Sequence, residues 1–100
     1  MVQVIWTEPA LADLQGVHDF IARDSAYYAE TTVRRLRAAV ERLQLFPASG
    51  RIVPEFGAAY REVIEGAYRI IYRHLADEDV VLIDAVIHGR QRLPPFIDRW

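Results

Sequence analysis

Three runs rich in valine, isoleucine and tyrosine follow one another in the second half of the chain, with only short breaks between them. They span residues 60–65, 67–75 and 80–88, and they are separated by Gly66 and by the acidic segment 76–79. β-Branched and aromatic residues favour strands, and turns this short join only antiparallel neighbours. The sequence therefore predicts a three-stranded antiparallel meander in this half of the chain.

A short strand and two amphipathic helices are predicted before the meander. In residues 2–6, Val2, Val4 and Trp6 alternate with Gln3 and Ile5, a β-branched and aromatic run that is typical of a strand. Thr7 is a suitable N-cap for a helix that follows. Apolar residues then recur every three or four positions, at Ala10, Leu11, Leu14, Val17 and Ile21. After a turn near 23–25 the same spacing returns, at Ala29, Val33, Leu36, Val40 and Leu43. Pro47 ends this second helix, and the two helices form an antiparallel hairpin.

These elements predict an α+β fold with two layers, in a single domain spanning residues 1–100. The N-terminal strand and the antiparallel helix hairpin are expected to pack on one face of a mainly antiparallel sheet. A chain of 100 residues has room for one core of this kind. The segment 47–59, which is rich in glycine and proline, is expected to be a loop with a short edge strand at 51–53.

The two faces of the last predicted strand differ in chemistry. Every second residue is apolar, and this face is expected to lie on the helices: Val81, Ile83, Ala85 and Ile87. Asp84 and His88 are expected on the opposite, open face of the sheet. There the carboxylate of Asp84 would favour the cationic form of the histidine.

Several classes of function are excluded by what the sequence lacks. It has no cysteine, which excludes disulfides and thiolate chemistry, and its three histidines do not have metal-ligand spacing. P-loop, Rossmann and nucleophile-elbow motifs are absent as well, so we expect no metal and no cofactor. No segment approaches the ~20 apolar residues of a membrane span, and no export signal opens the chain. We therefore expect a cytoplasmic protein without membrane contact.

The charge is close to neutral overall but unevenly distributed. Twelve basic and 14 acidic residues give a net charge of −2, whereas residues 31–50 contain four arginines and one glutamate. The overall balance argues against a general nucleic-acid binder. Every basic residue is an arginine, which suits bidentate phosphate contacts but is also explained by genome composition.

Two arginines of the middle strand lie on one face of the predicted sheet. Arg69 and Arg73 are four residues apart, so alternation directs both to the same side, where two guanidinium groups suit phosphate. The alternative is that they pair with Glu62, Glu65 or Asp84 across the strands and only solvate the outer face.

Glu55 and His88 are the candidates for proton transfer. Glu55 can act as a general base if its loop folds over the sheet, and the alternative is a solvated loop glutamate. His88 can act as an acid or a base near neutral pH, or it is a structural residue at the end of a strand. Arg90 and Arg92, after the last strand, can bind phosphate or dock a partner.

Three segments, in this order, resemble one known family. They are PASGRIVPEFG at 47–57, YREVIEGAYRIIYR at 60–73 and VLIDAVIHGRQRL at 81–93. The most specific part is the pattern R-E-x-x-x-G-x-Y-R-I-x-Y, followed by V-x-H-G-R. With the helix hairpin before them, these segments resemble the RelE/ParE superfamily of bacterial type II toxins.

The resemblance implies a growth-inhibiting toxin that is neutralised by a cognate antitoxin protein. RelE-like members cleave mRNA in the ribosomal A site without a metal, and ParE-like members poison DNA gyrase. For a nuclease it implies catalytic roles for Glu55, Arg69 and His88, and substrate binding by Arg51, Arg61, Arg73, Arg90 and Arg92. We expect the nuclease, acting on ribosome-bound mRNA.

Two alternatives stay open. Nuclease members commonly carry lysines in the loop and a tyrosine after the last strand, and this chain has no lysine and no tyrosine after Tyr72. An inhibitor of DNA gyrase is therefore the first alternative. The second is a non-toxic member of the family that acts as a binding partner.

Overall fold

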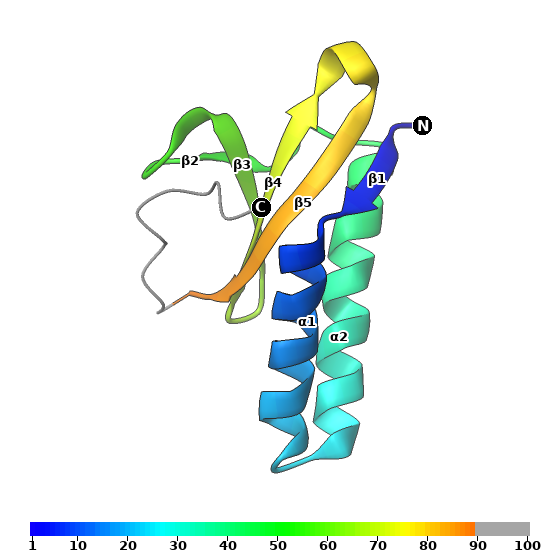
Figure 1. Ribbon diagram of the computed structural model, residues 1–100, viewed down its shortest axis with the longest axis vertical. Helices are drawn as coiled ribbons and strands as arrows, with labels where there is room; N and C mark the ends of the chain where they lie inside the picture. The colour runs from blue at the N-terminus through cyan, green and yellow to red at the C-terminus, as the bar shows by residue number, and fades with distance from the viewer. Residues whose placement is uncertain (90–100) are drawn as a thin grey trace.

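The computed structural model describes residues 1–89, which form two helices against a five-stranded sheet (Figure 1). The elements are β1 (Gln3–Trp6), α1 (Glu8–Ala22), α2 (Ala26–Glu41), β2 (Arg51–Val53), β3 (Gly57–Glu65), β4 (Tyr68–Leu75) and β5 (Val80–His88). Single turns of 3-10 helix follow α2 and β4. The helix hairpin covers one face of the sheet, which confirms the predicted α+β architecture. Within residues 1–89, neither helix is long and apolar enough to cross a membrane.

Hydroxyl groups cap both helices, and Thr7 does so at the position predicted for it. Thr7 Oγ1 accepts a hydrogen bond from the backbone N–H of Ala10 at 3.3 Å and donates one to the carbonyl oxygen of Ile83 at 2.7 Å. Ser25 Oγ accepts the N–H of Tyr28 at 3.1 Å. Such caps provide partners for donors that the first helical turn leaves unsatisfied. Thr7 therefore both begins α1 and fastens it to β5.

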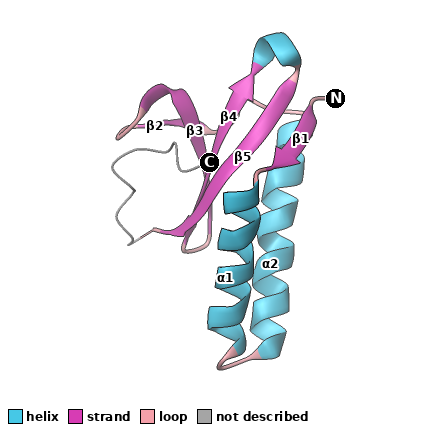
Figure 2. Cartoon of the chain, in the orientation of Figure 1, coloured by secondary structure: helices cyan, strands magenta, loops and turns pink. Residues whose placement is uncertain are grey.

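The strands are arranged in the order β1-β5-β4-β3-β2. β1 runs parallel to β5, with Gln3 opposite Val80, and the other three pairings are antiparallel. Figure 2 shows β1 at one edge of the sheet and the short β2 at the other. The predicted meander and the predicted edge strand at 51–53 are both confirmed. The first strand of the chain thus pairs with β5, the last strand described.

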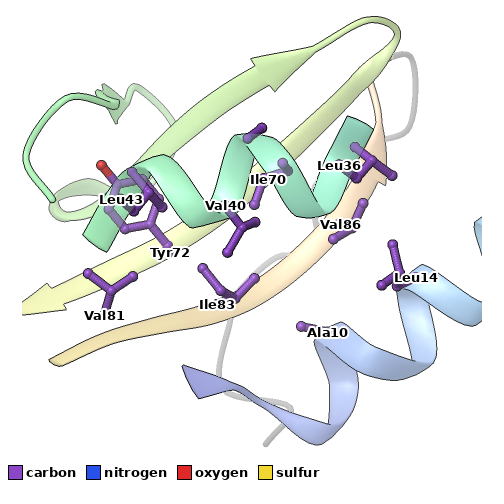
Figure 3. Close-up of a cluster of buried hydrophobic side chains, with 11 residues drawn as sticks. Ala10, Leu14, Leu36, Val40, Leu43, Ile70, Tyr72, Val81, Ile83 and Val86 are labelled. Carbon is purple, nitrogen blue, oxygen red and sulfur yellow. The ribbon is translucent and has the colours of Figure 1, made fainter. Parts of the chain in front are cut away.

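The main core lies between the helices and the sheet (Figure 3). Its buried side chains are Ala10, Leu14, Leu36, Ala39, Val40, Leu43, Ile70, Tyr72, Val81, Ile83 and Val86. A smaller core lies on the opposite face, where Phe56 and Tyr60 pack over four buried residues, Val53, Ile71, Ala85 and Ile87. Burying a side chain of the size of leucine or isoleucine contributes about 1.5–3 kcal/mol, so both faces of the sheet are stabilised.

A β-bulge in β5 changes which residues face the helices. Ile71 pairs with Ala85 and Tyr72 pairs with Ile83, so Asp84 is an extra residue opposite the junction. A bulge places two successive residues opposite one and interrupts strict alternation. The prediction that Ala85 and Ile87 face the helices is therefore wrong, because both belong to the core of the opposite face.

Gly50 lies in close contact with the buried ring of Tyr72. The Tyr72 hydroxyl donates to the carbonyl of Pro47 at 2.8 Å and accepts the N–H of Gly50 at 2.9 Å. A Cβ atom at position 50 would lie 2.6 Å from that hydroxyl and 2.7 Å from the carbonyl oxygen of Glu62. Only glycine fits here without displacing the ring or β3. The contact fixes the start of β2 against the sheet.

Gly50→Ala should therefore lower the free energy of unfolding by about 2 kcal/mol, because overpacking a fixed site forces a shift of backbone or ring. Denaturant unfolding followed by circular dichroism measures this change. The matched control is Gly16→Ala in α1, where an added Cβ meets nothing within 4 Å. That variant should gain up to about 1 kcal/mol from helix propensity. Equal stability of the two variants would contradict the close contact at Gly50.

Candidate functional site

A cavity of about 480 Å³ lies where the β3–β4 hairpin and the end of β5 meet. Its walls contain Glu55, Arg69 and His88, the three residues for which catalytic roles were expected. Arg51, from β2, lines it as well. Residues from four separate segments of the chain are thus brought to one concave site, which is the usual form of a ligand site.

A buried carboxylate organises the two arginines of this cavity. Glu62 is 1% exposed, and its Oε1 accepts a hydrogen bond from Arg69 Nε at 2.6 Å. Its Oε2 accepts one from Arg51 Nε at 2.5 Å. Two charge-assisted hydrogen bonds compensate for the desolvation of a buried carboxylate. Glu62 therefore holds both guanidinium groups at fixed positions.

Glu55 contacts the other end of the Arg69 side chain. Its two carboxylate oxygens accept hydrogen bonds from the two terminal nitrogens of Arg69, both at 3.2 Å. These hydrogen bonds hold the pKa of Glu55 below its ordinary value, and Glu55 in turn raises the pKa of Arg69. Glu55 is thus an ionised hydrogen-bond acceptor at neutral pH. The loop does fold over the sheet, which was the condition set for a role of Glu55 as a general base.

His88 lies on the helix side of the sheet, so the expectation that it faces the open side with Asp84 is wrong. Its ring packs edge-on against Tyr68, with centroids 5.5 Å apart. Besides the cavity with Arg69, it lines a groove of about 530 Å³ beside α1. The bulge at Asp84 is the cause, because it reverses the faces of the residues that follow it.

Arg73 and Arg61 are not brought to the cavity. Arg73 forms two hydrogen bonds with the buried carboxylate of Asp84, at 2.7 and 2.8 Å, and stacks over Tyr60. Cross-strand pairing, the alternative considered for Arg73, is therefore found. Arg61 donates to the carbonyl of Gly50 at 2.8 Å, beside Tyr72 on the helix side. The structure does not support the expected placement of these two residues at a substrate site.

The remaining expectations concern metal ligands and the C-terminal arginines. Among residues 1–89, no group of three or more histidine, aspartate or glutamate side chains is placed to hold a metal ion. Arg90 and Arg92 lie outside the described residues. Glu62 was considered only as a pairing partner for the arginines. Its central position depends on strand registers that place Arg51 directly opposite it and Arg69 opposite Ile64, two residues along β3.

The comparisons with known proteins agree with this fold and with the motif order. The family described as the ParE toxin of the type II toxin-antitoxin system parDE matches residues 4–93. The chain belongs to the ParE toxin family. The RelE2 toxin of Caulobacter vibrioides is 35% identical over 77 residues, which is 77% of this chain and 84% of that toxin. This ParE-family chain is thus a toxin of the RelE/ParE superfamily.

Two solved structures show the same fold as this ParE-family toxin. The ParDE system of P. aeruginosa has a chain with a TM-score of 0.72 and 20% identity, covering 88% of this chain and 96% of that one. The toxin-antitoxin complex RelBE2 of Mycobacterium tuberculosis has one with a TM-score of 0.66 and 21% identity, covering 87% and 96%. The family is therefore shown by sequence, and the architecture by both sequence and structure.

Proposed function

We propose that this toxin cleaves ribosome-bound mRNA at the cavity that contains Glu55, Arg69 and His88, and that an antitoxin neutralises it. One observation carries the proposal: these three residues, from a loop and two strands, line one cavity. A carboxylate, a guanidinium and an imidazole can supply the base, the charge stabilisation and the acid that metal-independent cleavage of a phosphodiester uses.

The three groups divide the reaction between them. Glu55 accepts the proton of the ribose 2′-hydroxyl, whose oxygen then forms a bond to phosphorus. Arg69 stabilises the negative charge that develops on the phosphate oxygens. The bond from phosphorus to the 5′-oxygen breaks, and His88 gives that leaving oxygen a proton. The products are a 2′,3′-cyclic phosphate and a 5′-hydroxyl, so no metal or cofactor enters the balance.

An antitoxin partner fits the surface beside the helices. The similar solved structures are named as toxin-antitoxin systems or complexes. Here a groove of about 530 Å³ runs between α1 and the end of β5, with Phe20, Tyr68 and Val86 among its walls. Apolar grooves and open sheet edges accept helical or extended partner segments. Since His88 lines this groove as well, an antitoxin segment bound there would contact a proposed catalytic residue.

Inhibition of DNA gyrase is the second candidate, and one observation favours it. On the open face of the described sheet each guanidinium group contacts a carboxylate, Arg51 and Arg69 with Glu62 and Arg73 with Asp84. A site that binds an RNA backbone usually presents a surplus of positive charge. The balanced charge of this face suits a protein target better than it suits RNA.

Purified toxin and two parallel assays test the proposal. Ribosomes carrying a defined mRNA are incubated with the toxin and mapped by primer extension, and DNA gyrase is assayed for supercoiling and for trapped cleavage complexes. We expect cuts within the codon at the A site and normal supercoiling. Intact mRNA together with trapped gyrase complexes would replace the proposal by the second candidate. Inactivity in both assays, and no growth arrest on induction, would indicate a non-toxic member.

A further inference from the structure

The two carboxylates that contact Arg69 differ sharply in exposure and distance. The Glu62 side chain is fully buried and lies 2.6 Å from Nε, whereas the Glu55 side chain is 49% exposed and lies 3.2 Å from each terminal nitrogen. The same guanidinium group therefore has one short, buried contact and one longer contact that is open to water.

This difference determines which contact can be exchanged. An ion pair that is open to solvent is worth little, because water and salt replace each partner at small cost. Separating a buried pair is much more costly, because it leaves a charge without compensation. An incoming anion therefore displaces Glu55 from Arg69 far more readily than it displaces Glu62.

The geometry of the Glu55 contact also identifies the competing anion. Two parallel N–H···O hydrogen bonds from the terminal nitrogens of an arginine form the fork arrangement with which arginine binds carboxylate or phosphate. The two non-bridging oxygens of a phosphodiester fit this fork as the two oxygens of Glu55 do. Arg51, held by the same Glu62, lines the same cavity and adds a second positive charge.

We propose that Glu55 occupies the phosphate position on Arg69 in the resting toxin, that a substrate phosphodiester displaces it, and that Glu62 holds Arg69 in place during the exchange. The inference rests on the proposed function, because the exchanging anion is the phosphate to be cleaved. Displacement also removes the hydrogen bonds that lower the pKa of Glu55. The released carboxylate then becomes a stronger base at the step where a base is needed.

Binding of a dinucleotide that cannot be cleaved tests the exchange without any ribosome. The probe is a 2′-deoxy dinucleoside monophosphate, which has the phosphodiester but lacks the attacking hydroxyl. The affinity is obtained from the backbone amide signals of Gly66, Ala67 and Gly89, which line the cavity, in ¹H–¹⁵N spectra. The side-chain Nε–H of Arg69 is followed in the same spectra. Glu55→Gln should bind the probe about fivefold more tightly than the wild type, because the competing charge is gone. The Arg69 Nε–H signal should stay close to its resting position, because Glu62 remains its acceptor.

Two further variants make the measurement specific. Glu65→Gln is the matched control, because it removes the charge of a glutamate on β3 that pairs with Arg42 at 3.8 Å and does not line the cavity. Its affinity should stay within about twofold of the wild type. In the double variant Glu55→Gln/Arg69→Lys, the gain should disappear, because lysine has no fork.

Each outcome separates the exchange from the nuclease proposal. Tighter binding by Glu55→Gln alone supports the exchange, even if the wild type fails to cleave ribosome-bound mRNA, in which case the proposed function is wrong. Weaker, unchanged or undetectable binding by this variant overturns the exchange, even if the toxin is an active nuclease. A large shift of the Arg69 Nε–H signal in the bound state would overturn the role assigned to Glu62.

Discussion

Replacing Glu55 by glutamine should reduce cleavage of ribosome-bound mRNA by about 10²- to 10⁴-fold, the usual contribution of a general base. The amide cannot accept the proton of the 2′-hydroxyl, although it keeps the size of the carboxylate. Single-turnover cleavage, measured by primer extension, gives the rate. The fold should be unaffected, because the side chain is half exposed and Arg69 keeps its buried partner Glu62.

Glu55→Gln is informative because its cleavage rate and its affinity for the dinucleotide should change in opposite directions. Cleavage falls while affinity for the uncleavable dinucleotide rises, and a merely misfolded protein would lose both. Glu65→Gln again serves as the control and should cleave at the wild-type rate. If Glu55→Gln cleaved within about tenfold of the wild type while remaining folded, Glu55 would not be the base.

Arg69→Ala should lower the free energy of unfolding by about 3 kcal/mol, the lower end of the cost of breaking a buried ion pair. The buried Glu62 carboxylate would lose one of its two guanidinium partners, and only Arg51 would remain. For a chain of this size the melting temperature should fall by roughly 12–24 °C. The activity of this variant alone therefore cannot separate a catalytic role of Arg69 from a structural one.

A double-mutant cycle isolates the contribution that the contact between Arg69 and Glu62 makes to stability. Adding Glu62→Gln to Arg69→Ala replaces the buried carboxylate by a neutral amide, and at least 1 kcal/mol of the loss should be recovered. The control is Arg42→Ala, which removes a solvent-exposed pair with Glu65 and should change stability by less than about 0.5 kcal/mol. If the double variant were as unstable as the sum of the two single variants, Glu62 would not depend on Arg69 for its compensation.

The elements of the fold could be predicted from the sequence because local chemistry defines them. Thr7 and the region of Ser25 begin the helices as caps, apolar residues at three- and four-residue spacing mark the buried helix faces, and short turns leave antiparallel pairing as the only choice for β3–β5. Each of these signals acts within a few residues. The architecture then followed from packing the apolar faces together.

The faces of β5 could not be predicted beyond Asp84. Residues 80–87 are apolar apart from this aspartate, so both faces look alike in the sequence and alternation is the only guide. The bulge breaks alternation to place Asp84 against Arg73, and it moves Ala85 and Ile87 to one face and His88 to the other. The signal for the bulge that the sequence does contain is Asp84 itself, a charged residue inside an otherwise apolar strand.

The site was predicted in part. Glu55, Arg69 and His88 were selected by residue type and by the family resemblance, and the structure brings them to one cavity. The buried position of Glu62 depends instead on the registers of three strands, in which Arg51 lies opposite Glu62 and Arg69 lies two pairs beyond it, opposite Ile64. Contacts of this kind arise from tertiary packing, and residue type alone does not reveal them.

The parallel pairing of β1 with β5 has a consequence for how the toxin is made. Residues 3–6 find their sheet partners at 80–83, so the first strand cannot take its final place until the last one has been synthesised. Pairings between distant parts of a chain also form slowly, because the intervening loop must close first. While the nascent chain is still on the ribosome, β1 and the apolar face of α1 lack the strand that covers them. The toxin therefore acquires its finished sheet only after translation of nearly all the described chain, and a newly made molecule has an interval in which a partner can bind it before that sheet is complete.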